Sequence, residues 1–195
     1  MGEPGDINIY KDQLDTPNRS DRAEQGCNGQ FGIKVLPRSP AEEVTDPSSQ
    51  KQGREAAIIA RQVFIQTCND QGIRLLSKKR TLVATPSGAL IVLPFARELP
   101  DHPDKWFLGV QDGSTPSICP YWCVAFLCQG MDERLLTFIV PQKHLQQYWN
   151  QFSRHKGNVL FHIQRVGVNF TLDMPGNNPI RLNVYQEAYA NLKDV

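Results

Sequence analysis

Hydrophobic positions recur with helical spacing between residues 50 and 71. Spacings of three and four residues place one set of side chains on a single helix face: Ala56, Ile59, Ala60, Val63, Phe64 and Thr67. Ser49 and Gln52 fit a capping box at the start of this segment, and Gly72 suits the position just after its end. The pattern predicts a helix over 50–71 that buries this face.

Short apolar runs separated by turn-forming residues follow this helix, and they predict strands. The expected strands are 80–85, 89–95, 106–110, 122–128 and 135–140. Residues 86–88 (Pro-Ser-Gly) would join the first two strands in a hairpin. The last two runs are almost entirely apolar and are bounded by turn residues, which is typical of central strands covered on both faces. Because side chains alternate along a strand, Cys123 and Cys128 are expected on opposite faces.

The C-terminal part predicts a second helix, two more strands and a short third helix. Pro141 suits a helix start, and four large side chains then follow at helical spacing: Leu145, Tyr148, Trp149 and Phe152. Gly157 would end this helix. The expected later elements are strands at 159–164 and 168–172 and a helix from about Asn183. This order predicts an α+β domain over 50–195, with a mixed central sheet flanked by helices.

Residues 1–49 differ in composition from the rest of the chain. They are rich in Gly, Pro, Asp, Ser and Gln, and only the run 31–36 is apolar enough for a strand. We therefore expect a poorly ordered acidic N-terminal arm ahead of the domain.

Composition excludes some classes of protein. The chain has 195 residues, of which 40% are hydrophobic and 21% charged, which suits one domain with a core of its own. It contains no apolar run long enough to span a membrane, and its N-terminus carries acids and prolines where a secretory signal needs positive charge and then an apolar stretch. An odd count of five cysteines then favours free thiols and a cytoplasmic location. The cysteines are expected to be small buried hydrophobes, and no metal site is predicted.

The formal net charge of +1 conceals a segregation of charge along the chain. Residues 50–80 carry a net charge of +5 and residues 142–181 a net charge of +4, whereas residues 1–49 carry −4. Two clusters make up the candidate nucleic-acid-binding residues: Lys78, Lys79 and Arg80, and Arg154, His155 and Lys156. Either the clusters converge into one patch that attracts phosphate, or they are two separate solvated surfaces. The sequence leaves both open, and a helix C-terminus by itself favours cations.

The order of the predicted elements and two short motifs together resemble a known protein family. The predicted first helix contains Gly53-Arg54-Glu55, and an apolar strand ends in Phe138-Ile139-Val140-Pro141 before the next helix. Over residues 50–192 the chain thus resembles the PD-(D/E)XK nuclease superfamily. The resemblance implies a restriction-endonuclease-like fold and a nucleic-acid partner, DNA rather than RNA. It would place the chain in mobile-element, restriction or defence functions, or as the partner of a catalytic subunit.

The chain departs from that superfamily where its catalytic residues belong. Thr81 stands at the position of the first acid, and Val92 and Pro94 stand at those of the later acid and lysine. No lysine in the chain has Asp or Glu two residues before it. The leading expectation is therefore nucleic-acid binding without metal-dependent catalysis and without a cofactor.

Two alternatives remain open. One is an active, Mg²⁺-dependent nuclease with displaced acids, whose candidates are Glu55, Glu98, Asp101, Asp104 and Asp112. The other is a protein-interaction or regulatory module whose acidic arm binds a basic protein partner. Neither alternative involves a membrane.

Overall fold

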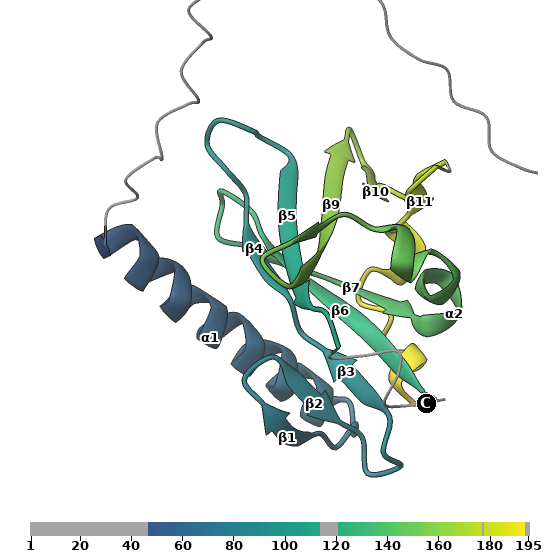
Figure 1. Ribbon diagram of the computed structural model, residues 1–195. Helices are drawn as coiled ribbons and strands as arrows, with labels where there is room; N and C mark the ends of the chain where they lie inside the picture. Colours follow the sequence, from purple (N-terminus) through teal and green to yellow (C-terminus); the bar gives the residue numbers. More distant parts are fainter. Residues whose placement is uncertain (1–46, 114–120, 177, 194–195) are drawn as a thin grey trace, which may run out of the picture. The chain divides into compact units, whose positions relative to one another are not determined.

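The computed structural model describes residues 47–113, 121–176 and 178–193 (Figure 1). All of them belong to one structural unit, Val44–Val195. The expected arm lies outside the described residues except for its last three, which begin helix α1. Cys27 and Cys119 also lie outside them.

Helix α1, Pro47–Asp70, packs on the protein through a narrower stripe than the sequence predicts. Ala60 and Phe64 are buried as expected, together with Ala57 and Cys68. Two members of the predicted face are instead exposed, Ile59 at 54% and Val63 at 48%. The buried positions recur at three- and four-residue intervals, so they form one narrow stripe along the helix that packs against the protein. The prediction for Ile59 and Val63 was wrong.

The strands form two sheets instead of the single central sheet predicted. The first sheet has the order β1-β2-β3-β6, with β7 and β4 also paired to β6; β3 and β4 run parallel to β6 and the other pairs are antiparallel. Its strands are β1 Leu76–Lys79, β2 Leu82–Ala84, β3 Leu90–Val92, β4 Phe95–Arg97, β6 Trp122–Gln129 and β7 Leu135–Pro141. The expected mixed sheet is thus present.

The second sheet is antiparallel, with the order β11-β10-β9-β5 and with β8 paired to β9. Its strands are β5 Lys105–Gln111, β8 Arg154–His155, β9 Asn158–Val166, β10 Asn169–Leu172 and β11 Ile180–Arg181. Burial alternates strictly along β5, so this sheet has one buried and one exposed face. The fold is α+β.

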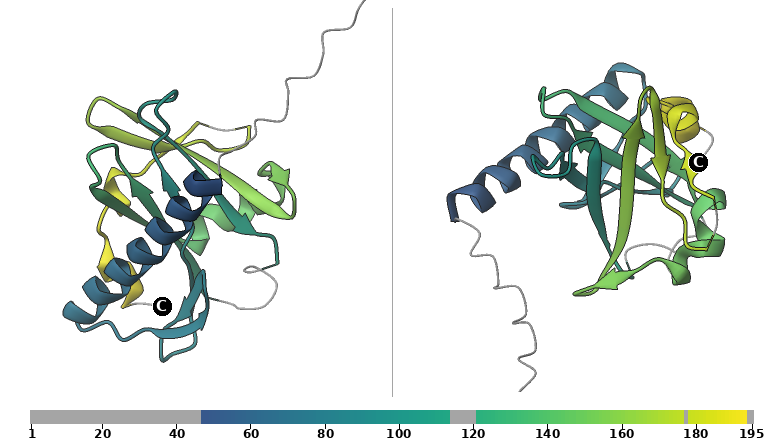
Figure 2. Two further views of the ribbon diagram at one scale, coloured as in Figure 1. Left: turned by 90° about the vertical axis from the view of Figure 1, so that its left-hand side faces the viewer. Right: turned by 90° about the horizontal axis from the view of Figure 1, so that it is seen from above.

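The main core lies between the two sheets. The inward side chains of β5 and β9 meet one face of β6 and β7, with Phe126 and Phe161 edge to face at 5.1 Å. Helix α1 covers the other face of the first sheet, where Phe64 stacks on Tyr189 (Figure 2). Strand β6 is therefore buried on both sides, as its unbroken apolar run predicts. Cys123 and Cys128 lie on opposite faces of β6, as predicted, in the two different core clusters.

The predicted second helix is shorter than expected. Helix α2, Gln142–Leu145, continues as the 3₁₀ helix η1, Gln146–Gln151, and residues 154–155 already form β8. Its large side chains are nevertheless anchors, because Trp149 packs on Trp122 at 5.1 Å and Phe152 on Phe161 at 4.7 Å. The last predicted helix consists of two 3₁₀ turns, η2 Asn183–Tyr185 and η3 Tyr189–Leu192. Among the described helices, none has the length and apolar character to cross a membrane.

Candidate functional site

Thr81, Val92 and Pro94 lie together, beside residues that are distant from them in the sequence. They line one depression of about 390 Å³ between the first sheet and the edge of the second. Its other lining residues are Gly109, Val110, Gln111, Lys156, Gly157 and Asn158. We call it the Lys156 depression. The described residues that line it include a lysine and two amide side chains but no carboxylate.

An interrupted strand forms one wall of the depression. Val92 pairs with Val124 and Phe95 pairs with Leu127, so β3 and β4 keep one register along β6 and are a single strand broken at Leu93-Pro94. Pro94 still accepts a hydrogen bond from Leu127 N at 3.0 Å, but it has no N–H for the ladder. The missing donor at Pro94 accounts for the break between β3 and β4.

Arginine side chains adjoin the same wall. Leu93 N donates to Thr81 O at 2.9 Å, and Arg61 Nε donates to Leu93 O at 3.0 Å. Burial lowers the pKa of Arg61, and the positive charge of Arg80 lowers it further. Arg80 itself is exposed and directly precedes Thr81, one of the residues that line the depression.

Lys156 reaches the depression from a tight hairpin. His155 pairs with Asn158, which leaves Lys156 and Gly157 as the two turn residues, with φ of 48° and 76°. A two-residue hairpin with positive φ at both positions matches the right-handed twist of strands. Gly157 therefore makes a turn and does not end a helix as predicted. Lys156 is exposed at the tip.

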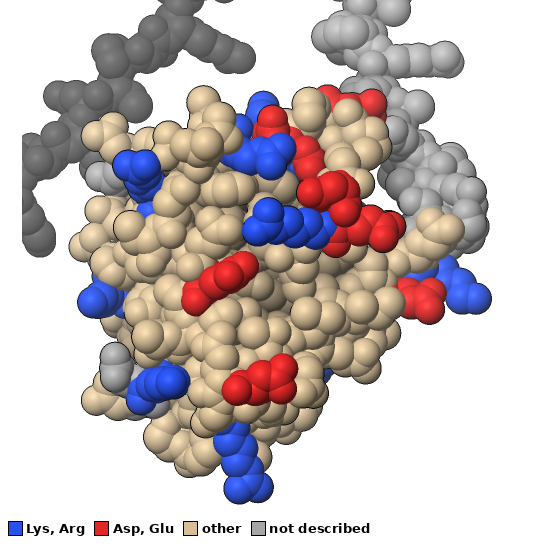
Figure 3. Space-filling model, turned by 180° about the vertical axis from the view of Figure 1, so that it is seen from behind, with Lys and Arg blue, Asp and Glu red and all other residues tan. Residues whose placement is uncertain are grey.

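The two predicted basic clusters are brought together only in part. Lys156 lines the depression, and the exposed Arg80 directly precedes Thr81, which also lines it, whereas Lys78 and Lys79 are exposed on β1, the edge strand of the first sheet. His155 is exposed on β8. On the face seen from behind, acidic and basic side chains are intermixed, so that face offers no surface of a single sign (Figure 3).

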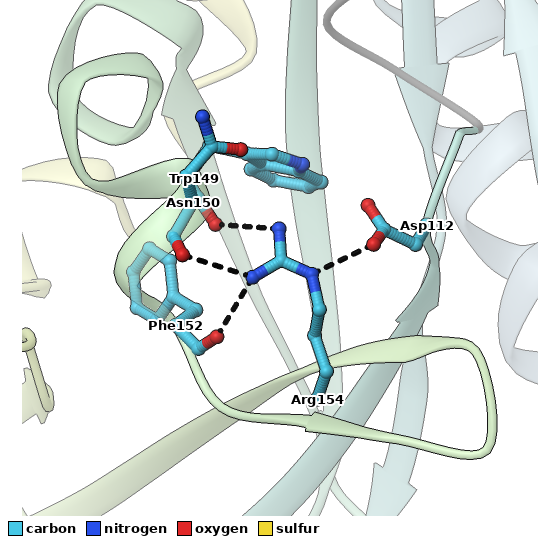
Figure 4. Close-up of polar contacts among 5 residues, drawn as sticks. All are labelled: Asp112, Trp149, Asn150, Phe152 and Arg154. Atoms are coloured by element: carbon cyan, nitrogen blue, oxygen red, sulfur yellow. Dashed lines mark hydrogen bonds and ion pairs between the residues drawn. The ribbon is translucent and has the colours of Figure 1, made fainter.

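The guanidinium group of Arg154 is held by hydrogen bonds within the protein. Its Nε donates to Asp112 Oδ2 at 2.7 Å, and its terminal nitrogens donate to the carbonyls of Trp149, Asn150 and Phe152 at 3.1–3.2 Å (Figure 4). These carbonyls close the end of η1 and the chain that follows it. Four of the five donor hydrogens of the guanidinium are thereby used. Arg154 fixes the start of the hairpin that carries Lys156, and it has little capacity left for phosphate.

The candidate catalytic acids are dispersed over other parts of the surface. Glu55 lines a groove of about 600 Å³ beside α1, with Arg97 and Glu133. Asp101 is exposed in a turn, and Asp104 pairs with Arg165. None of these acids lines the Lys156 depression.

The other two candidate acids also have structural partners. Glu98 is buried, and its two oxygens accept from Asp104 N at 2.6 Å and Met131 N at 3.0 Å, which ties two turns together. Asp112 accepts from Arg154, and this hydrogen bond lowers the pKa of the Asp112 carboxyl. Their geometry is explained by loop and hairpin structure.

The residues of the depression do not fit a divalent ion. Mg²⁺ prefers carboxylate oxygens among protein ligands, and the described lining residues supply none. Elsewhere in the described part of the chain, no three His, Cys, Asp or Glu side chains are grouped as metal ligands. Cys68, Cys123 and Cys128 are free and buried, and burial raises the pKa of Cys68 and of Cys123 to about 12. Such thiols remain protonated at neutral pH.

Sequence reasoning missed several members of this surface. Gln111 and Asn158 stand opposite each other on β5 and β9, and Arg61 faces the wall from α1. Burial alternates strictly along β5 and places Gln111 on the exposed face, but the apolar run 106–110 shows no such alternation in the sequence. Comparison of the chain with protein-family models, curated proteins and solved structures finds no match in any of the three.

Proposed function

We propose that this domain binds nucleic acid at the Lys156 depression without cutting it, with DNA as the expected form. One observation carries the proposal. The three positions at which the superfamily resemblance puts catalytic residues line a single depression, whose described lining includes Lys156 and no acid, and the exposed Arg80 directly precedes Thr81 in the chain.

The chemistry of the depression suits a phosphate backbone. Arg80 and Lys156 are exposed cations, and the Thr81 hydroxyl and the amides of Gln111 and Asn158 are donors of the kind that contact phosphate oxygens. Because Arg154 and Gly157 fix the hairpin, Lys156 is held in position before any ligand binds. Contacts of this kind give affinity and register, and they carry no base specificity.

In this proposal the domain supplies binding to a reaction performed elsewhere, as a partner of a catalytic subunit in mobile-element, restriction or defence functions. Residues 1–49, with their net charge of −4, are a candidate for the contact with a basic protein partner. A purely regulatory protein-interaction module would keep that contact and lack affinity for nucleic acid.

Salt dependence of binding tests the proposal. The Arg80→Ala, Lys156→Ala variant should bind a labelled DNA duplex more weakly than wild type. The slope of log K against log salt should fall by about 2, because each phosphate contact contributes about 0.9. The matched control is Lys51→Ala, Lys143→Ala, which removes the same charge from two exposed lysines that do not line the depression. Equal slopes in the two double variants, or no wild-type binding at about 50 mM salt, would reject the proposal.

A further inference from the structure

The exposed face of the second sheet carries an aromatic centre. Phe107 on β5 pairs with His162 on β9, and their rings lie edge to face with centroids 4.8 Å apart. The ring of His102 also lies edge to face with Phe107, at a centroid distance of 6.3 Å. Phe107 is 45% exposed, and both histidines are exposed. The face therefore presents three adjoining rings to solvent.

The core does not explain this aromatic centre. The adjacent residues Trp106 and Leu108 point into the core and are fully buried, so β5 anchors the second sheet without Phe107. Phe107 and the two histidines form one exposed cluster of rings that the packing of the sheet does not require. In proteins that hold single strands of nucleic acid, such rings stack on the bases.

The ring cluster adjoins the Lys156 depression through Gly109. Gly109 is the next residue along β5 on the same face as Phe107, about 7 Å away at the usual rise of a strand, and it also lines the depression. It has no side chain to separate the two. A Cβ at Gly109 would meet Asn158 Cβ at 3.5 Å and Asn158 Cγ at 3.7 Å, both ordinary contacts. Gly109 thus connects the ring cluster to the depression along β5 without an intervening side chain.

Charge on this face also suits a polyanion. The row next to Phe107 runs Lys105, Gln164, Thr171 and Arg181 across four paired strands, with an exposed cation at each end. Lys156 supplies a third cation at the depression. The nearby acids include Asp101, in the turn beside His102, and Asp173, whose N–H donates to His162 O. Asp104, next to Lys105, is paired with Arg165, and Asp112, next to Gln111, is paired with Arg154.

We infer that the exposed face of the second sheet, centred on Phe107, stacks the unpaired bases of a single strand of nucleic acid whose backbone enters the Lys156 depression. This inference rests on the proposed function and specifies its substrate class. Paired bases lie inside a duplex and cannot stack on Phe107, so a duplex would use the depression alone. The shared chemistry is a phosphate chain with exposed bases, whether DNA or RNA.

Binding of three probes of equal length, about 20 nucleotides, tests the inference. The probes are single-stranded oligothymidine, the same backbone without bases, and a DNA duplex, each followed by fluorescence anisotropy. Wild type should bind the oligothymidine most tightly. Phe107→Leu, which keeps apolar bulk and loses the ring, should weaken oligothymidine binding about tenfold and leave the other two unchanged. Phe107→Trp should retain the affinity, which a merely structural role for the phenyl ring would not predict.

A second variant blocks the path between the sites without changing charge. Gly109→Val adds a β-branched side chain, of a type that strands favour, whose Cβ meets only ordinary contacts. It should weaken oligothymidine binding, and thermal unfolding measured beside it checks that the variant is folded. An oligouridine probe run in parallel identifies DNA or RNA as the preferred strand, and stronger binding of either supports the inference.

The outcomes separate the inference from the proposed function. If all probes bind in an Arg80- and Lys156-dependent way but Phe107→Leu and Gly109→Val bind oligothymidine and oligouridine like wild type, the single-strand inference is overturned and the binding function stands. If wild type binds none of the probes, both are overturned.

Discussion

Arg154 and Asp112 join two distant segments of the chain through a 2.7 Å hydrogen bond between Nε and Oδ2. The pair links the end of β5 to the start of the β8–β9 hairpin, and Asp112 N also donates to Gly157 O at 2.9 Å in the hairpin turn. The hairpin that presents Lys156 is therefore held to the end of β5 at its start, through Arg154, and at its turn, through Gly157.

The first prediction concerns the acid stability of this link. The pKa of Asp112 is lowered in the folded state, first by its hydrogen bond to Arg154. Its contribution to stability is therefore complete above the unfolded pKa of about 3.9, and it is lost as pH falls from there through the folded value. Asp112→Asn should destabilise the protein at pH 7 and lose this effect at pH below the folded value. An Asp112 titration midpoint at or above about 3.9, followed by NMR, would contradict the prediction.

The second prediction separates Arg154 from Lys156. Arg154→Ala leaves three carbonyls and Asp112 without their donor, and it should lower the free energy of unfolding by about 1–3 kcal/mol. Lys156→Ala should leave stability within about 0.5 kcal/mol of wild type, because its side chain is exposed. Urea unfolding measures both. A Lys156 variant as unstable as the Arg154 variant would show that Lys156 supports the hairpin instead of a ligand.

The third prediction concerns the packing of α1. Phe64 is 1% exposed, and Phe64→Ala should cost about 3–5 kcal/mol. Ile59→Ala, on the part of the predicted face that is exposed, should cost less than about 1 kcal/mol. Comparable losses in thermal or urea unfolding would mean that the helix is rotated relative to the structure described.

The fourth prediction concerns catalysis. The depression offers Thr81, Val92 and Pro94 where an acid, an acid and a lysine would be needed, so the purified protein should not cut plasmid or single-stranded DNA with Mg²⁺ or Mn²⁺. An Asp101→Ala, Asp104→Ala variant assayed beside it is the control for displaced acids. Metal-dependent cleavage by wild type that this variant loses would establish the active-nuclease alternative.

The sequence predicts elements of this fold better than their pairing. The unbroken run 122–128 correctly predicts a strand buried on both faces, because every side chain in it is apolar or small. The second sheet could not be predicted, since Gly109 pairs with Leu160 across a long stretch of chain and nothing local specifies that partner. The helix face was predicted too wide for a similar reason. Ile59 and Val63 fit the helical period, but only the tertiary packing decides which flank of the stripe is covered.

Part of the candidate site could be predicted, because the resemblance singled out three positions at which the chain lacks the expected acids and lysine. Thr81, Val92 and Pro94 were singled out by type, and the structure places them side by side. Arg154 and Lys156 carry the same charge two residues apart, and only the hairpin geometry directs one to carbonyls and the other to solvent. Phe107 was missed because 106–110 was predicted only as a short apolar strand, and nothing in the run marks an exposed position. A sheet with one open face nevertheless exposes every second residue.

The most direct measurement of the central claim is a map of backbone amide hydrogen exchange with and without a short DNA. Binding at the Lys156 depression predicts added protection in three separate segments, 80–82, 109–111 and 156–158, which only this fold brings together. The amides of residues 131–134 lie in the connection between β6 and β7 and do not line the depression, so they should exchange at unchanged rates. Saturating DNA that protects none of the three segments, or that protects 131–134 instead, would contradict the account.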